Sequence, residues 1–134
     1  MSFTQVEVDY LASQQLGRLA TEQPDGTLQV SPVGFTHNAK LGTIDIGGFN
    51  MAASRKYRNV VANGKVAFVV DDIASVRPWR VRCLEIRGTA EGIDGPDGAL
   101  IRVHPRRIIS FGIEGLNQGP QDMTTNIRDV VQPA

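Results

Sequence analysis

Residues 16–35 read LGRLATEQPDGTLQVSPVGF, two segments rich in apolar residues on either side of a turn. Within the turn, the ring of Pro24 fixes its φ angle and Gly26 readily adopts a positive φ, so the chain reverses direction. The segments 16–21 and 27–35 are therefore predicted to pair as an antiparallel β-hairpin. This hairpin makes an antiparallel sheet the starting point for the fold.

Elements on both sides of the hairpin extend this pattern. Before it, Thr4 and Glu7 have the spacing of a capping box, which predicts a short helix that ends near residue 13. After it, Gly88 in the middle of a long apolar segment predicts a bulge. The other predicted elements are a helix over 51–63 and strands over 43–47, 65–71, 80–93 and 100–113, the last interrupted at His104-Pro105.

Short turns join consecutive strands, so their pairing is expected to be mostly antiparallel. A sheet of this size commonly closes on itself to remove its exposed edges. The predicted fold is mainly β, an antiparallel split β-barrel of six or seven strands with two short helices. The 134 residues show no repeat or linker, so we expect one domain over 1–134 with a helix within 1–13. The tail over 114–134 is expected to be irregular, and only 125–130 suggests a short helix there.

Charge and cysteine content restrict the function classes. Lysine and arginine number 14, as do aspartate and glutamate, so a global basic field for nucleic acid is absent. No apolar run approaches the ~18 residues of a membrane span, and the N-terminus lacks a signal-peptide pattern. Cys83 is the single cysteine and the two histidines are far apart, so no metal site is predicted. We expect a cytoplasmic protein that works without metal, membrane or nucleic acid.

The first candidate site is the segment Ser54-Arg55-Lys56-Tyr57-Arg58-Asn59. It places a hydroxyl and three cations at the start of the second predicted helix, shortly after a strand that ends in two glycines. Lys56 and Asn59 are three residues apart and share one helix face. Helix N-termini carry unpaired N–H groups and a positive dipole, so the segment suits an anion such as phosphate. The alternative is an ordinary solvated basic face.

Two further segments are candidates for ligand contacts. In 30–35, Pro32 marks a sheet edge or bulge, and Gly34 leaves room above the backbone for a flat aromatic ring. The alternative there is a plain edge irregularity. In 77–82, three arginines flank Trp79, and such a group stacks on anionic or aromatic ligands or binds nucleic acid. The alternative is a loop with a partly exposed tryptophan.

Several catalytic signatures are missing from the sequence. It shows no nucleophile paired with a base, no pair of carboxylates in an apolar setting and no glycine-rich nucleotide loop. If the protein is an enzyme, a cofactor brings the reactive group and the chain supplies position and electrostatics. No catalytic side chain is assigned.

The order of these motifs resembles the pyridoxamine-phosphate-oxidase-like split β-barrel family. The resemblance rests on the short helix, the Pro-Asp-Gly turn and the segments 16–21, 29–33, 54–60, 84–90 and 104–112. Within the family the sequence looks like the short actinobacterial proteins that use the 8-hydroxy-5-deazaflavin coenzyme (F-420), in the subgroup that includes the tetracycline-pathway reductase. The chain lacks the Arg-Leu-x-Pro ending of true pyridoxamine phosphate oxidases, which argues against pyridoxal phosphate synthesis.

The resemblance implies a homodimer with two cofactor sites at the subunit interface and a small-molecule substrate. The residues that it implies for cofactor binding fall into four groups. They are Lys56 and Asn59 at the phosphate end with Ser54 and Arg55 beside them, Ser31, Pro32 and Val33 under the ring, Gly48 and Asn50 in the loop beside the ring, and Trp79 in a less regular region.

The favoured function is an F-420-dependent oxidoreductase in which a hydride passes from C5 of the reduced cofactor to an activated C=C or C=N bond. An FMN-binding oxidoreductase of the same fold is the alternative, because the phosphate contacts of the two cofactors look alike. A third function is a non-catalytic carrier of a flavin or deazaflavin, because the sequence shows no acid–base constellation. The zero net charge disfavours a nucleic-acid binder.

Overall fold

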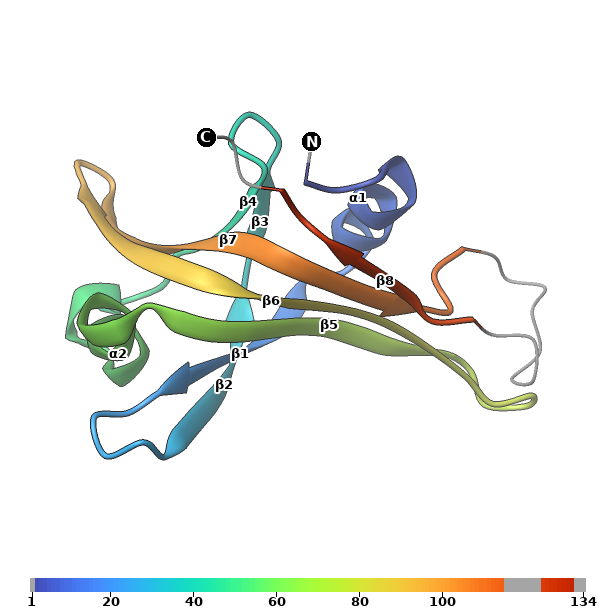
Figure 1. The fold of residues 1–134 in the computed structure, drawn as a ribbon, viewed down its shortest axis with the longest axis horizontal. Helices are drawn as coiled ribbons and strands as arrows, with labels where there is room; N and C mark the ends of the chain where they lie inside the picture. Colours follow the sequence, from blue (N-terminus) through green and yellow to red (C-terminus); the bar gives the residue numbers. More distant parts are fainter. Residues whose placement is uncertain (1, 115–123, 132–134) are drawn as a thin grey trace.

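The computed structural model describes residues 2–114 and 124–131, which form an antiparallel β-sheet with two α-helices (Figure 1). The sheet runs in the order β2-β1-β5-β6-β7-β4-β3, and β8 pairs with β7. In chain order the elements are α1 (Gln5–Ala12), β1 (Leu16–Glu22), β2 (Leu28–Gly34), β3 (Thr36–Asn38), β4 (Thr43–Ile46), the 3-10 turn η1 (Met51–Ala53), α2 (Arg55–Asn63), β5 (Lys65–Ser75), β6 (Arg80–Gly95), β7 (Gly98–Phe111) and β8 (Asn126–Asp129).

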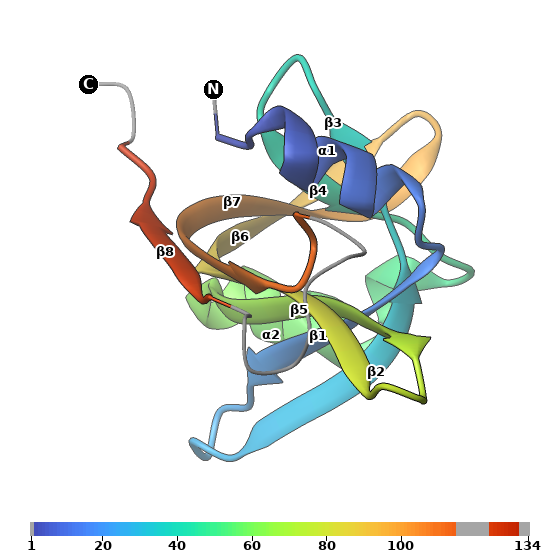
Figure 2. The same ribbon diagram turned by 90° about the vertical axis from the view of Figure 1, so that its right-hand side faces the viewer.

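The two ends of the sheet order, β2 and β3, are separated in the chain by Phe35 alone. A sheet that starts at β2 and finishes at β3 must therefore curl round on itself. Between the described strands no ladder joins β2 to β3, so the barrel is split at this point. Figure 2 shows the strands curving round a common interior, with α1 against β3 and β4. The predicted antiparallel barrel with two short helices is confirmed, with eight described strands instead of six or seven.

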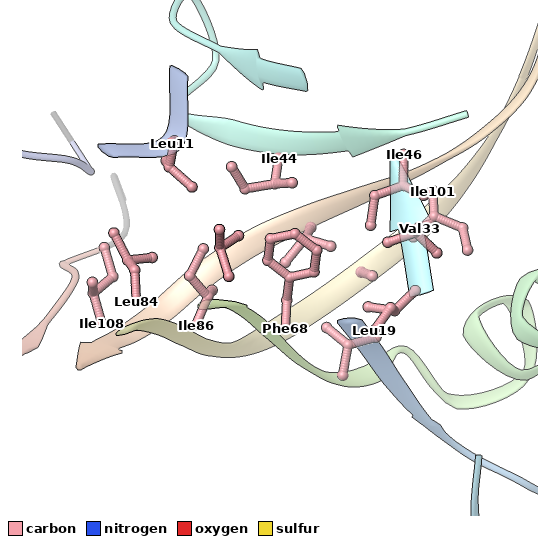
Figure 3. Close-up of a cluster of buried hydrophobic side chains, with 14 of the residues drawn as sticks. Leu11, Leu19, Val33, Ile44, Ile46, Phe68, Leu84, Ile86, Ile101 and Ile108 are labelled. Carbon is pink, nitrogen blue, oxygen red and sulfur yellow. The ribbon is translucent and has the colours of Figure 1, made fainter. Parts of the chain in front are cut away.

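Aliphatic side chains, with Phe68 among them, fill the interior (Figure 3). Because successive side chains of a strand point to opposite faces, every second residue enters this core, as Ile44 and Ile46 do from β4. Phe68 lies near the middle, and its ring occupies the place where any Cβ on Gly17 would be. Leu11 of α1 reaches the same cluster, which fixes the helix at one end of the barrel.

The predicted capping box and the predicted bulge are both confirmed. Thr4 Oγ1 accepts from the Glu7 N–H, and the Glu7 carboxylate accepts from the Thr4 N–H. At the bulge, Arg87 pairs with Arg107 but Gly88 pairs with Pro105, so β7 contains one extra residue. A Cβ on Gly88 would collide with the carbonyl of His104, which explains the glycine.

Four predicted boundaries are wrong. The strand predicted over 27–35 ends at Gly34, because Phe35 turns onto Phe68 in an edge-to-face contact, and a separate β3 follows. The predicted 51–63 helix is broken at Ser54, which adopts an extended conformation to cap α2. The gap left between the predicted strands 80–93 and 100–113 is mostly paired strand, since β6 runs to Gly95 and β7 starts at Gly98. The predicted interruption at His104-Pro105 is absent, because the bulge absorbs the proline within a continuous β7.

The tail is also more regular than predicted. Residues 126–129 form β8, where a helix was suggested, because the edge of β7 offers backbone partners that satisfy these residues as a strand. Part of the tail predicted to be irregular, 115–123 and 132–134, lies outside the described residues.

The outer surface of the barrel has two contrasting faces. On what we call the apolar face, Val30, Ala20 and Ala67 are neighbours across β2, β1 and β5. Together with Val69 they line a shallow depression of about 270 Å³, to which Arg18, Phe68 and Glu85 also contribute. On the charged face, formed by β4, β7 and β6, two pairs of outward side chains bring an acidic residue against a basic one. Arg102 donates two hydrogen bonds to Asp45, and His104 Nε2 lies 2.5 Å from Glu91 Oε2.

The two α-helices in these ranges are too short to cross a membrane.

Candidate cofactor-binding site

The start of α2 is built around Ser54. Its hydroxyl donates to the carbonyl of Met51 (2.6 Å) and accepts from the N–H of Tyr57 (3.2 Å), so one residue ends η1 and caps α2. The first N–H groups of an α-helix have no intrahelical acceptor, and Ser54 satisfies only that of Tyr57. The N–H groups of Arg55 and Lys56 therefore remain available at a positively polarised helix end.

Two asparagines one turn apart fasten α2 to the barrel. The Nδ2 of Asn59 donates to Thr21 Oγ1 (3.0 Å), which donates in turn to Gln29 Oε1 (3.0 Å). Asn63 donates to the carbonyl of Glu22 (2.9 Å). Asn59 is 1% exposed, so its amide faces β1 and the barrel interior and does not share the open surface of Lys56. Its contacts assign Asn59 to positioning the helix.

The basic residues of the chain divide into two sets. Seven of the fourteen lysines and arginines form an ion pair with a described carboxylate. Arg55, Lys56 and Arg58 have no such pair, and neither have Arg77 and Arg80 beside Trp79. Both basic segments singled out in the sequence thus keep cations that no described carboxylate neutralises.

These residues fit an anionic group such as phosphate. The start of α2 combines available N–H groups, a helix dipole and three unpaired cations, which is the donor set that binds phosphate in proteins. Among the described residues, the buried side-chain atoms without a hydrogen-bond partner are Ser31 Oγ and Asn59 Oδ1. Both belong to residues that the family resemblance implies for the cofactor. Unsatisfied polar groups and unpaired charge therefore gather on and beside α2.

The segment Ser31-Pro32-Val33 lies on β2, the end strand of the sheet order, as the proline predicts. Ser31 lies two residues from Gln29 on the same inward side of the strand, so the Asn59–Thr21–Gln29 chain links this segment to α2. Val33 is buried and contributes to the core, which leaves only its backbone for a ligand. Pro32 points outward and is exposed.

Gly48 and Asn50 lie in the exposed loop between β4 and η1, directly before the start of α2. Asn50 has a left-handed backbone conformation with φ of 55°. The structure therefore brings this loop and the segment from Ser54 to Lys56 together.

Trp79 is not brought to this site within one chain. It lies in the turn between β5 and β6, at the opposite end of the hairpin from α2 (Figure 1). The 11 residues of β5 separate the two, a span of roughly 30 Å for an extended strand. Residues 73–81, which we call the hairpin arm, extend beyond the parts of β5 and β6 that pair with β1 and β7, and they expose Ile73, Val76 and Trp79.

Thr21, Gln29 and Gly92 help to form this site, although the sequence analysis missed them. A Cβ on Gly92 would lie 2.8 Å from Cζ of Tyr57, so the glycine allows α2 to pack against β6. The sequence offers one signal for Thr21. It occupies an inward position in the alternating pattern of β1, where a polar side chain needs a hydrogen-bond partner.

Titratable groups elsewhere are committed to structural contacts. Arg82 donates twice to Asp72 and holds the pKa of that carboxyl below its ordinary value. Tyr10 donates to the same carboxylate (2.8 Å), and burial raises the pKa of its hydroxyl. Burial also raises the pKa of the Cys83 thiol to about 11, which keeps it protonated and unreactive at neutral pH.

Comparison with known proteins agrees with this architecture. The family model for pyridoxamine 5'-phosphate oxidase matches residues 3–119. A 5a,11a-dehydrotetracycline/5a,11a-dehydrooxytetracycline reductase from Streptomyces rimosus is 43% identical over 97% of this chain and 94% of its own length.

Two solved structures share the fold. A conserved hypothetical protein from Mycobacterium tuberculosis superposes with a TM-score of 0.70 at 19% identity, covering 84% of this chain and 86% of its own. An FAD-binding protein from Mycobacterium smegmatis superposes with a TM-score of 0.63 at 21% identity, covering 81% of this chain and 93% of its own. Together with the family match, these comparisons confirm the split-barrel fold and show an enzyme. The chain belongs to the pyridoxamine 5'-phosphate oxidase family and is an oxidoreductase.

Proposed function

We propose that the chain is an F-420-dependent reductase that binds the cofactor phosphate at the start of α2. The observation that carries the proposal is the group of unpaired cations Arg55, Lys56 and Arg58 on a capped helix N-terminus. Both FMN and F-420 carry a phosphate, so this observation supports the anion site, and the family resemblance favours F-420 over FMN.

The substrate class comes from the Streptomyces rimosus relative, a reductase of 5a,11a-dehydrotetracycline. We assign to this chain the reduction of the same kind of conjugated C=C bond in a flat polycyclic substrate. The reduced cofactor, when bound, supplies a hydride to one carbon, and a proton from solvent completes the saturated bond at the other. No side chain of the protein needs to act as a nucleophile.

The residues have separate roles in this proposal. The N–H groups and side chains of Arg55 and Lys56 hold the phosphate, and Ser54 keeps the helix end open toward it. Asn59 positions α2 through Thr21. The backbone of Ser31, Pro32 and Val33 lies under the ring, with Gly48 and Asn50 beside it.

A homodimer completes the site. The hairpin arm has a single ladder and exposes large apolar side chains, and two-stranded ribbons of this kind are marginally stable alone. In a homodimer with a two-fold axis at the apolar face, the strands of the second copy would run in the opposite direction to those of the first. The arm of one subunit, with Arg77, Trp79 and Arg80, would then approach the α2 start of the other.

Cofactor titration with a turnover assay tests the function. Purified protein is titrated with F-420 and with FMN, and reduced F-420 is then mixed with 5a,11a-dehydrotetracycline. We expect tighter binding of F-420 and substrate-dependent oxidation of the reduced cofactor. Tight FMN binding with a yellow purified protein would favour the FMN-dependent alternative. Binding of F-420 without turnover would favour the carrier.

A further inference from the structure

Phe49 is the most exposed large hydrophobic residue in the described part of the chain, with 98% of its side-chain surface open. It lies between Gly48 and Asn50, five residues before the cap of α2. Exposed single hydrophobic residues are common on protein surfaces, so exposure alone has no functional meaning. The structure of the loop that holds this ring is what points to a function for Phe49.

The loop is fixed at both of its ends. Before Phe49, Ile46 of β4 is fully buried, and after it Met51 is 3% exposed in the core. The N–H of Ala53 donates to the Asn50 carbonyl (3.0 Å), and that of Ser54 donates to the Met51 carbonyl (2.9 Å). An aromatic ring on such a framework loses little conformational entropy when something packs on it.

The exposed residues around Phe49 in the chain are small and uncharged. Gly47, Gly48, Ala52 and Ala53 are all exposed, and a Cβ on Gly47 would touch nothing within 4 Å. The 3-10 turn carries the chain from this surface to Ser54 in a few residues, at about 2 Å per residue. The result is a largely exposed, uncharged segment over 47–53, which we call the shelf; it carries one aromatic ring and directly precedes the unpaired cations of α2 in the chain.

We propose that Phe49 packs against the flat face of the substrate and sets the affinity for it; this rests on the proposed function. A hydride acceptor with a conjugated C=C bond is planar, and planar apolar faces stack on aromatic rings. The cofactor phosphate is bound through the charges of α2, whereas the shelf around Phe49 carries none. The substrate therefore binds through the Phe49 ring, and the cofactor binds through the cations of α2. A change at Phe49 should then alter the affinity for the substrate and not the affinity for the cofactor.

Phe49→Ala and Phe49→Trp are compared with Val61→Ala, a control that shortens an exposed apolar side chain on α2. In Phe49→Ala the KM for 5a,11a-dehydrotetracycline should rise at least about tenfold with little change in kcat. Phe49→Trp and Val61→Ala should stay within about threefold of wild type. The Kd for F-420 and the mass in solution should not change in any variant.

Binding of tetracycline to the cofactor-loaded protein gives a readout that does not depend on turnover. Weaker tetracycline binding by Phe49→Ala supports the inference even if the wild-type protein reduces no substrate, in which case only the proposed reaction fails. Equal tetracycline binding by the two proteins, or none by wild type, overturns the inference. An equal loss of F-420 affinity, or a halved mass, also overturns it, because Phe49 would then contact the cofactor or a second copy.

Discussion

The apolar face and the charged face are made by strands of one sheet, yet their outward side chains are arranged in opposite ways. On the charged face, Arg102 is paired with Asp45 and His104 is in contact with Glu91. On the apolar face, Val30 is 66% exposed beside Ala20, and the charged side chains of the same depression, Arg18 and Glu85, are paired with Asp71 and Arg87. Water satisfies the first arrangement, whereas only another apolar surface satisfies the second. The contrast supports the apolar face as the side of the barrel that meets the second copy in the proposed homodimer.

Placing a charge on each face is the strongest test of this contrast. Val30→Glu would bury a carboxylate in the proposed homodimer interface, so we expect dimer dissociation to become easier by at least about 100-fold. Thr89→Glu puts the same charge on the outer side of β6, opposite Lys65, and should leave the dimer intact. Sedimentation velocity measures both. Equal masses for the two variants would show that the apolar face is not the interface.

The second test concerns the buried hydrogen bond between Asn59 and Thr21 that holds α2. If this bond is lost, water cannot replace it. Asn59→Ala removes the donor to Thr21 and opens a small cavity, so the free energy of unfolding should fall by about 2 kcal/mol. Asn63→Ala removes an exposed bond from the same helix to Glu22 and should cost about 0.5–1 kcal/mol. Urea unfolding gives both values. A larger loss of stability in Asn63→Ala than in Asn59→Ala would contradict the assignment of Asn59 as the main contact that holds α2.

A partly buried ion pair should depend on pH in a defined direction. Arg82 and Tyr10 bind the Asp72 carboxylate and keep its pKa below the ordinary 3.8. A lowered pKa stabilises the folded protein above that value, and the contribution disappears as the pH falls through the folded-state pKa. Asp72→Asn should therefore cost about 1–3 kcal/mol at pH 7 and less at pH 3. Unfolding curves at the two pH values that show the same gap would contradict this.

The smallest effect is expected on the charged face itself. Glu91 and His104 are both solvent-accessible, so breaking their contact by Glu91→Gln should change the free energy of unfolding by less than about 0.5 kcal/mol. Thermal unfolding in parallel with Asp72→Asn measures the difference. If Glu91→Gln is as damaging as Asp72→Asn, the charged face is a structural network and not a solvated surface.

Local signals in the sequence predicted the features whose causes are local. The capping box of Thr4 and Glu7, the turn at Pro24 and Gly26, the helix stop at Gly64 and the bulge at Gly88 each depend on neighbouring residues or on one backbone conformation. The strand β8 was not predicted, because its backbone partners lie on β7, some 20 residues away.

The site was only partly predictable for the same reason. The sequence shows Arg55, Lys56 and Arg58, but whether a cation is paired depends on carboxylates from distant strands. It also placed Lys56 and Asn59 on one helix face, whereas the contact with Thr21 takes Asn59 into the interior. The resemblance implied cofactor contacts for both Trp79 and the α2 residues. Only the length of β5 shows that these residues cannot meet at one site within a single chain.

Removing the Lys56 side chain tests the account most directly. F-420 is titrated into Lys56→Ala, wild type and Lys65→Ala, a control that removes an exposed lysine from the start of β5. We expect the Kd to rise at least about tenfold in Lys56→Ala, the loss of one charge-assisted contact to phosphate, and to stay within about twofold in Lys65→Ala. An unchanged Kd in Lys56→Ala, or an equal change in the two variants, would contradict the placement of the cofactor phosphate at α2.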